Sequence, residues 1–168
     1  MKYKRVHIFG GAGSGKTTLA RQYSTRFGIP HHELDDFYYL EAAARKRRQK
    51  SERDQLLADS IVEEAWVLDG IFWQPWVQPS IERADKIIVL AIPEKTLRYR
   101  IVKRHFQYLS KAKLKDYRYF FPTLLELLRH NRAYQGGPFL ETLELLSGVS
   151  EKLSICASND EAAIEMGL

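Results

Sequence analysis

Several features are scarce or missing in this 168-residue sequence, and each absence narrows the kind of protein it encodes. Cys156 is the only cysteine, so no disulfide framework can form, and a reducing compartment is expected. The longest apolar run, residues 87–92, is far shorter than the roughly 20 residues that span a bilayer. The first residues lack the apolar core of a signal peptide. We therefore expect a cytoplasmic protein without a membrane-spanning segment.

The length and the composition are those of one ordinary globular unit. A chain of 168 residues with 45% apolar residues can bury a core without disulfides or a structural metal. No repeat, low-complexity tract or linker interrupts it. The sequence therefore predicts a single domain over residues 1–168.

Positive charge is the least ordinary feature that is present. The net charge is +5, yet residues 95–118 hold nine lysines and arginines against one aspartate, a net charge of +8. Residues 45–53 form a second cluster, with six basic residues against one glutamate. Clustered positive charge favours a polyanionic ligand, either a phosphorylated small molecule or a nucleic acid.

Short apolar segments alternate with segments that are long enough to form helices. Gly28 and Pro30 end the first predicted helix, and Pro93 begins the second. Alternating strands and helices predict an α/β fold of three layers, in which helices cover both faces of a parallel sheet. The strands are expected at residues 5–9, 32–35, 65–69, 86–92 and 153–157, and the helices at 16–27, 94–109, 122–134 and 139–146.

The first strand leads into a glycine-rich loop with the pattern G-x-x-x-x-G-K-T, at Gly10–Thr17. Glycines let backbone N–H groups turn toward phosphate oxygens, and the N-terminus of the following helix adds a partial positive charge. In such a loop Lys16 reaches the β- and γ-phosphates, and the Thr17 hydroxyl ligates Mg²⁺. The residues expected to bind ATP here are Gly11, Gly13, Ser14, Gly15, Lys16, Thr17 and Thr18.

Two classes of phosphate-loop protein do not fit the chain. It has no Asn-Lys-x-Asp motif, the signature of guanine-nucleotide switches, and 168 residues leave no room for a separate motor domain. Phosphoryl transfer to a small molecule is the reaction class that remains.

Carboxylates follow two of the predicted strands, at the edge of a parallel sheet where ligands bind. Asp69 comes after an apolar strand and has the character of a Walker B carboxylate, which holds Mg²⁺ through water. Asp35 either accepts the proton of an attacking hydroxyl or holds a water bound to Mg²⁺. Asp36, in contrast, is expected to cap a helix.

Four stretches then occur in the order found in one family: Gly10–Thr18, Leu34–Asp35, Trp66–Gly70 and Arg83–Leu90. They resemble the P-loop kinases of the adenylate kinase type, and more closely the small adenylate-kinase-related proteins labelled DNA topology modulation or FlaR-like proteins. The resemblance covers nearly the whole chain. It implies a P-loop NTPase fold with a five-stranded parallel sheet of order 2-3-1-4-5, an acceptor region at about 35–65 and a lid at about 100–135.

The resemblance also assigns roles to two lid arginines. Arg100 and Arg104 are four residues apart, so they lie on one helix face and can reach the same ligand. By resemblance, Arg100 lies against the nucleotide base and Arg104 contacts the phosphates, which suits a bidentate guanidinium. Arg98 is expected to be a solvated surface residue.

The chain departs from adenylate kinases after Asp69–Gly70. Those enzymes have Phe-Pro-Arg there, and the arginine binds the phosphate of a nucleoside monophosphate, whereas this chain has Ile71–Trp73. Either the basic residues 45–53 replace that arginine or the acceptor is uncharged. Aromatic residues near both acidic strand ends either stack on a ring of the acceptor or belong to the core: Phe37, Tyr38, Phe72, Trp73 and Trp76.

Two smaller features lie at other predicted strand ends. His31 and His32 are adjacent on a strand, so their side chains point to opposite faces, and no third metal ligand is evident. Asn159–Glu161 is expected to form the loop against adenine and to cap the last helix.

The sequence thus predicts an ATP- and Mg²⁺-dependent kinase that transfers the γ-phosphoryl group to an unidentified small molecule, such as a nucleoside or a nucleotide. The alternative is an ATP-binding regulatory protein without metabolite kinase activity, acting on DNA through its basic segments. The sequence gives no indication of the oligomeric state. The expected catalytic residues are Lys16, Asp35 and Arg104, the lid residues that bind ATP are Arg100 and Arg104, and the Mg²⁺ ligands are Thr17 and Asp69.

Overall fold

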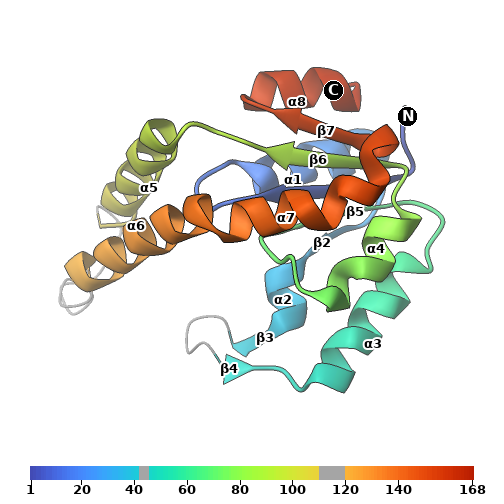
Figure 1. Ribbon diagram of the computed structural model, residues 1–168, viewed down its shortest axis with the longest axis horizontal. Coiled ribbons are helices and arrows are strands. Elements are labelled where there is room, and N and C mark those ends of the chain that lie inside the picture. Colours follow the sequence, from blue (N-terminus) through green and yellow to red (C-terminus); the bar gives the residue numbers. More distant parts are fainter. Residues whose placement is uncertain (42–45, 110–119) are drawn as a thin grey trace.

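The computed structural model describes residues 1–41, 46–109 and 120–168 (Figure 1). A sheet of parallel strands forms its centre, in the order β2-β5-β1-β6-β7. Counted within this sheet alone, the order is 2-3-1-4-5, so the predicted topology is confirmed. The strands are β1 (Arg5–Gly10), β2 (His31–Glu33), β5 (Trp66–Gly70), β6 (Lys86–Leu90) and β7 (Leu153–Cys156).

The three central strands are buried on both faces, which explains their nearly continuous apolar sequences. Side chains of β1 alternate between two core clusters: Val6 and Ile8 pack on one side, and Phe9 packs on the other. The strand register places Asp69 opposite Ile8 of β1 and Glu33 of β2. The carboxyl ends of these strands therefore meet at one edge of the sheet.

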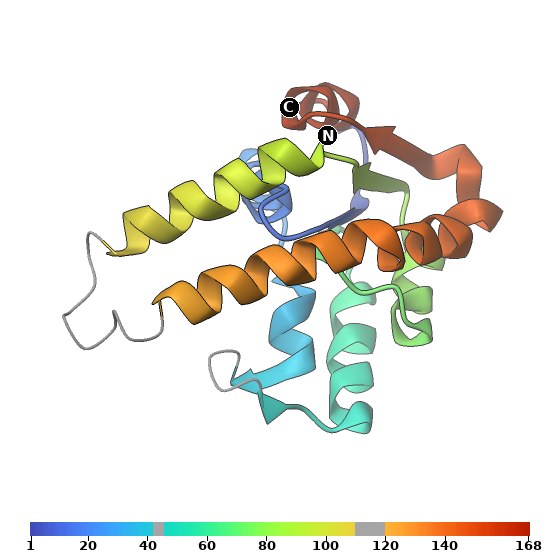
Figure 2. The ribbon, with the colours of Figure 1, turned by 60° about the vertical axis from the view of Figure 1, so that its left-hand side comes forward.

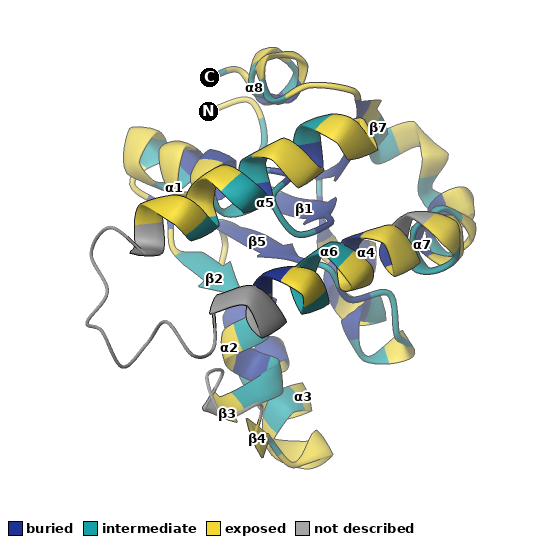
Figure 3. Ribbon diagram, turned by 90° about the vertical axis from the view of Figure 1, so that its left-hand side faces the viewer, coloured by how far each residue is buried: buried dark blue, intermediate teal, exposed yellow. Residues whose placement is uncertain are grey.

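Helices cover both faces of the sheet, so the predicted three layers are confirmed (Figures 1 and 3). Helices α1 (Lys16–Phe27) and α8 (Asn159–Met166) pack on the face of Val6 and Ile8. The other face carries α2 (Leu34–Tyr38), α3 (Lys50–Ile61), α4 (Gln78–Arg83) and α7 (Pro138–Leu146).

Two long helices project beyond the sheet, side by side (Figure 2). They are α5 (Glu94–Leu109) and α6 (Phe120–Gly136). Ile101 and Leu124 are buried between them, and Ala12 of the glycine-rich loop packs against this cluster. In the part of the chain that the structure describes, every helix is too short or too polar to cross a membrane.

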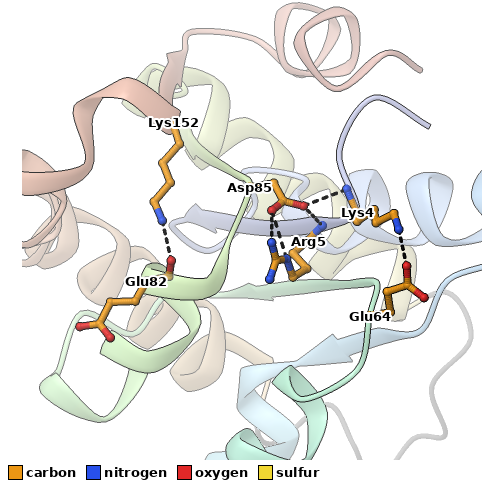
Figure 4. A network of polar contacts seen from close by, with 6 residues as sticks. All are labelled: Lys4, Arg5, Glu64, Glu82, Asp85 and Lys152. Atoms are coloured by element: carbon orange, nitrogen blue, oxygen red, sulfur yellow. Dashed lines mark hydrogen bonds and ion pairs between the residues drawn. The ribbon is translucent and has the colours of Figure 1, made fainter.

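The opposite edge of the sheet, at the amino ends of β1 and β6, is held by a polar network (Figure 4). Asp85 Oδ2 accepts hydrogen bonds from the backbone N–H groups of Lys4 and Arg5, at 3.1 and 2.9 Å. Asp85 Oδ1 accepts from the Arg5 guanidinium at 3.1 and 2.5 Å. Nearby, Lys4 pairs with Glu64, and Lys152 Nζ donates to the Glu82 carbonyl at 2.8 Å.

Several sequence predictions of local structure need correction. The predicted strand at residues 32–35 is wrong in its second half, because β2 ends at Glu33 and Asp35 lies in α2. Helix α6 begins before Pro122, since a proline is tolerated in a first helical turn. The sequence analysis missed α3, α4, the 3₁₀ helices Pro75–Val77 and Ser147–Lys152, and the hairpin of β3 (Tyr39–Glu41) and β4 (Lys46–Arg47).

Candidate functional site

The loop between β1 and α1 has a shape that requires glycine. Gly13 and Gly15 have φ angles of +79° and +89°, in the left-handed region that side chains disfavour. A Cβ atom at Gly15 would lie 2.7 Å from Asn159 Nδ2, and one at Gly13 would lie 3.1 Å from Ile101 Cγ1. The Ser14 N–H donates to the Gly11 carbonyl at 3.2 Å and closes the turn. The loop therefore has the compact form of a phosphate cradle.

The two long helices enclose this loop. A Cβ atom at Gly11 would lie 3.0 Å from Tyr134 Cδ1 and 3.2 Å from Asn131 Oδ1, both on α6. On the other side, the Leu97 carbonyl of α5 would lie 3.3 Å from a Cβ at Gly13. The loop is thus in close contact with α5 and α6 at once.

Asn131 and Tyr134 are site residues that the sequence analysis missed. Asn131 is only 2% exposed, and neither atom of its amide has a hydrogen-bond partner within the described residues. Tyr134 is 3% exposed, and burial raises the pKa of its hydroxyl. One sequence signal points to Asn131: it is a polar residue seven positions after Leu124, on the apolar face of the same helix.

A hydrogen-bonded chain links α1, β5 and β2. The Thr17 hydroxyl donates to Asp69 Oδ2 at 2.7 Å, and His31 Nε2 lies 2.7 Å from Asp69 Oδ1. Asp69 is 2% exposed, so this pairing satisfies a buried carboxylate. His32 points elsewhere, with its ring 5.8 Å from that of Phe37, as expected for adjacent residues of a strand.

These groups fit the requirements of Mg²⁺. Because the Thr17 hydroxyl donates its hydrogen bond to Asp69, the lone pairs of the hydroxyl oxygen stay available for a cation. Over residues 1–41, 46–109 and 120–168, no three His, Cys, Asp or Glu side chains cluster as a metal cage would. Mg²⁺ characteristically binds one or two protein oxygens and completes its shell with water and substrate phosphates. Thr17 and Asp69 match that mode of binding.

Asp35 lies in the first turn of α2, within electrostatic reach of Lys16. Burial raises the pKa of the Asp35 carboxyl, and the nearby carboxylates of Asp69, Glu33 and Asp36 raise it further, while Lys16 opposes the shift. The three expected groups Lys16, Asp35 and Asp69 are therefore gathered at one edge of the sheet. A carboxyl with a raised pKa is suited to accept a proton near neutral pH.

A cavity of about 500 Å³, here named the Arg100 cavity, opens on one side of the loop. Arg100 Nη1 donates to the Ser14 carbonyl at 3.2 Å and to Asn159 Oδ1 at 2.7 Å, while Asn159 Nδ2 donates to the Ser14 carbonyl at 2.8 Å. Arg104 lines the same cavity from the next turn of α5, as its spacing predicts. The other lining residues are Gly13, Gly15, Thr18, Leu19, Gln22, Gln107, Asp160 and Ala163.

One part of the expectation for Asn159–Glu161 needs correction, and the other part, the contact with adenine, stays a prediction. Asn159 does line the Arg100 cavity. The cap of α8, however, is Ser158, whose hydroxyl accepts the Glu161 N–H at 3.1 Å.

A second cavity of about 560 Å³, named the Tyr38 cavity, opens on the other side of the loop. The rings of Tyr38 and Phe72 stack with their centroids 4.7 Å apart at 29°. Of the five candidate aromatic residues, Tyr38, Phe72 and Trp73 line this cavity, whereas Phe37 and Trp76 do not. The other lining residues are Ala12, Asp35, Tyr39, Arg47, Ile71, Gln74, Leu127, His130, Ala133, Tyr134 and Pro138.

Part of the predicted basic segments lies outside the described residues: Arg45, Lys111, Lys113, Lys115 and Arg118. Arg98 is exposed and lies 3.8 Å from Glu94, as expected of a surface residue. Near the Tyr38 cavity, Arg48 pairs with Glu52, and Arg53 donates to Asp54 and stacks on Trp76 at 4.5 Å.

Comparison with known proteins finds one curated protein that is similar in sequence over part of this chain. No family model matches the chain. A curated protein of Bacillus subtilis (strain 168), described as uncharacterized protein YqaC, is 31% identical over 104 residues. That match covers 62% of this chain and 58% of the relative, so the chain spans less than two thirds of the length of YqaC.

Solved structures of two kinases are similar in fold. A shikimate kinase from Bacteroides thetaiotaomicron has a TM-score of 0.45 and 15% identity, covering 88% of this chain and 99% of that one. A gluconokinase from Sinorhizobium meliloti 1021 has a TM-score of 0.46 and 18% identity, covering 88% of this chain and 91% of that one. Likeness of this degree assigns no activity to the present chain.

Proposed function

We propose that the protein is an ATP-dependent kinase that phosphorylates a hydroxyl group of a small molecule. The observation that carries this proposal is the position of the glycine-rich loop between two separate cavities. A protein that only hydrolyses ATP needs a nucleotide site and a water molecule, and it needs no cavity for an acceptor. A second cavity of about 560 Å³, in the size range of metabolite sites, favours a transferase with its own acceptor.

In this proposal ATP occupies the Arg100 cavity, with its phosphates on the glycine-rich loop. Lys16 and the N-terminus of α1 offset the phosphate charge, Arg100 lies against the base, and Arg104 contacts the phosphates. Gly11, Gly13, Ser14, Gly15 and Thr18 complete the nucleotide site, since they form or flank the loop. Mg²⁺, when bound, neutralises further phosphate charge, and Thr17 and Asp69 would hold it, Asp69 through water.

The acceptor occupies the Tyr38 cavity, where Asp35 faces its hydroxyl. The hydroxyl oxygen forms a bond to the γ-phosphorus, the bond from that phosphorus to the β–γ bridging oxygen breaks, and ADP leaves. The proton of the hydroxyl passes to the Asp35 carboxylate, whose raised pKa favours this transfer. The resemblance of the loop and of Trp66–Gly70 to adenylate-kinase-type proteins supports the same assignment.

We further propose that α5 and α6 act as the lid, within a single domain that also holds an acceptor region at about 35–65. Both helices already contact the glycine-rich loop, through Leu97 and Ile101 of α5 and through Asn131 and Tyr134 of α6. A lid that stays close to the loop excludes water, and this suppresses hydrolysis of ATP.

The test is ADP release in the presence of a panel of nucleosides, nucleotides, sugars and polyols. At least one acceptor should stimulate ADP release, and Lys16→Ala should reduce the stimulated rate by about 10²- to 10³-fold. Lys152→Ala is the matched control, because Lys152 lies at the opposite edge of the sheet and should leave the rate unchanged. If stimulation survives Lys16→Ala, the mechanism is wrong. If ATP binds but no acceptor stimulates turnover, the protein is an ATP-binding regulator instead.

A further inference from the structure

Five of the fourteen residues that line the Tyr38 cavity are aromatic: Tyr38, Tyr39, Phe72, Trp73 and Tyr134. The Tyr38 ring stacks on that of Phe72, with centroids 4.7 Å apart at 29°, and meets the Tyr39 ring edge-on, with centroids 4.9 Å apart at 76°. Trp76 supports Phe72 from outside the cavity, at 5.3 Å. Tyr38 is half-buried, so part of its surface remains available for a ligand. Such surfaces bind planar rings by stacking.

The charges around this cavity do not suit a phosphate group. Within the described lining, Arg47 is the one lysine or arginine, and it is exposed, with its guanidinium 5.5 Å from the centre of the Tyr38 ring. The neighbouring Arg48 and Arg53 are already paired with Glu52 and Asp54. Phosphate recognition typically uses bidentate or clustered arginines, and one exposed arginine in a lining that also contains Asp35 falls short of that.

Gln74 adds a polar contact of a different kind. Its Oε1 atom is buried and has no hydrogen-bond partner among the residues described. A buried carbonyl oxygen without a partner costs free energy, and a ligand that donates a hydrogen bond removes that cost. Gln74 comes directly after the aromatic pair Phe72–Trp73, so this contact lies beside the stacking surface.

We infer that the acceptor is an uncharged alcohol that carries a planar unsaturated ring, which stacks on Tyr38 and Phe72 and donates a hydrogen bond to Gln74. This inference rests on the proposed function, because it places the acceptor in the Tyr38 cavity. Nucleosides without a phosphate have this chemistry: a flat base with N–H donors, joined to a sugar that bears the hydroxyl. Asp35 then faces the hydroxyl while the base lies between the aromatic residues and Gln74.

The experiment compares matched ligands by calorimetry, with ADP and Mg²⁺ kept saturating so that no probe enters the nucleotide site. Purine and pyrimidine nucleosides are each paired with their 5′-monophosphates, and ringless polyols serve as the third group. At least one nucleoside should bind with a Kd about 10-fold or more below that of its monophosphate. Polyols should show no binding at concentrations that saturate the nucleoside.

Variants locate the contact. Gln74→Ala should raise the nucleoside Kd about 5- to 10-fold, while Gln78→Ala, on the neighbouring helix and outside the lining, should leave it unchanged. Tyr38→Leu should raise the Kd about 10-fold or more, and Tyr38→Phe should retain tight binding because the stacking ring remains. Gln74→Met keeps the length of the side chain without its carbonyl oxygen; it is the second variant if Gln74→Ala fails to fold, and it should raise the Kd in the same way.

Three outcomes would overturn the inference. The first is tighter binding of a monophosphate that is lost in Arg47→Ala, because the acceptor would then be anionic. The second is phosphorylation of a polyol that Tyr38→Leu does not affect, because no ring would be needed. The third is no binding of any nucleoside at millimolar concentration. The proposed function is tested separately by ADP release: it stands if the monophosphate of the first case or the polyol of the second stimulates ADP release. A nucleoside that binds in the Tyr38 cavity but stimulates no ADP release would leave the inference on binding intact and contradict the proposed function.

Discussion

The two edges of the central sheet use carboxylates in opposite ways. At the carboxyl edge, burial raises the pKa of Asp35, whose charge Lys16 only partly compensates. At the amino edge, partial burial alone would raise the pKa of Asp85, but the hydrogen bonds from Arg5 and Lys4 outweigh it and lower the pKa (Figure 4). An aspartate is thus favoured in its charged form at the amino edge and disfavoured in that form at the carboxyl edge, where we propose that Asp35 acts as a base.

The largest expected effect is that of Asp35→Asn on the rate. If Asp35 accepts the proton of the acceptor, the variant should lose about 10²- to 10⁴-fold in kcat. The same variant should be as stable as the wild type or more stable at pH 7.5, because ionising Asp35 costs more in the folded protein than in the unfolded chain. Urea unfolding should show that this advantage grows as the pH rises through the folded-state pKa and vanishes near pH 3. A large loss of stability at pH 7.5 would contradict the comparison.

Asp85→Asn should show the reverse pattern. We expect a loss of about 2 kcal/mol in the free energy of unfolding at pH 7, because four hydrogen bonds to the carboxylate are weakened or lost. The activity per folded molecule should not change. Since the pKa of Asp85 is lowered in the folded state, its contribution is present above the unfolded-state pKa and disappears as the pH falls through the folded-state value.

Glu64→Ala is the control for the amino edge. Glu64 pairs with Lys4 but is largely exposed, so its removal should change the unfolding midpoint little. Equal losses of stability for Asp85→Asn and Glu64→Ala would show that the hydrogen bonds of Asp85 contribute no more to the free energy of unfolding than an exposed ion pair does.

Asn131→Leu is expected to change ligand affinity but hardly to change stability. The buried amide of Asn131 has no partner within the described chain, so an apolar side chain of similar size should keep or slightly raise the unfolding midpoint. ATP affinity should nevertheless fall by about 10-fold, because Asn131 lies against Gly11 of the phosphate cradle. Calorimetry with ATP measures the affinity, and Asn131→Asp shows whether the amide N–H matters. An unchanged Kd in both variants would make Asn131 a packing residue.

Local signals explain what the sequence predicted well. The bounds of α1 follow from the loop motif and from Gly28, and those of α5 follow from Pro93 and its apolar spacing. The strand order came from a family resemblance, and the sheet confirms it. In contrast, α3 buries only Leu57, Ser60 and Ile61, so its sequence carries too weak a periodicity to be recognised.

The missed site residues depend on contacts between distant segments. Asn131 and Tyr134 contact the glycine-rich loop only because α6 packs against it, although α6 follows the loop by more than a hundred residues in the chain. The partner of His31 is likewise distant in sequence: it is Asp69, which becomes its neighbour when β2 pairs with β5. No residue spacing within one segment encodes such contacts.

Tyr134 lies against Gly11 of the glycine-rich loop and also lines the Tyr38 cavity, so one side chain joins the loop proposed to hold the ATP phosphates to the proposed acceptor site. If a ligand in the Tyr38 cavity shifts this ring, the packing against Gly11 changes with it, and a shift of the loop in turn moves the ring. Thermodynamic reciprocity then requires that each ligand alter the affinity for the other by the same factor. Any cooperativity between the binding of the two proposed substrates would therefore be transmitted by the ring of a single residue, Tyr134 on α6.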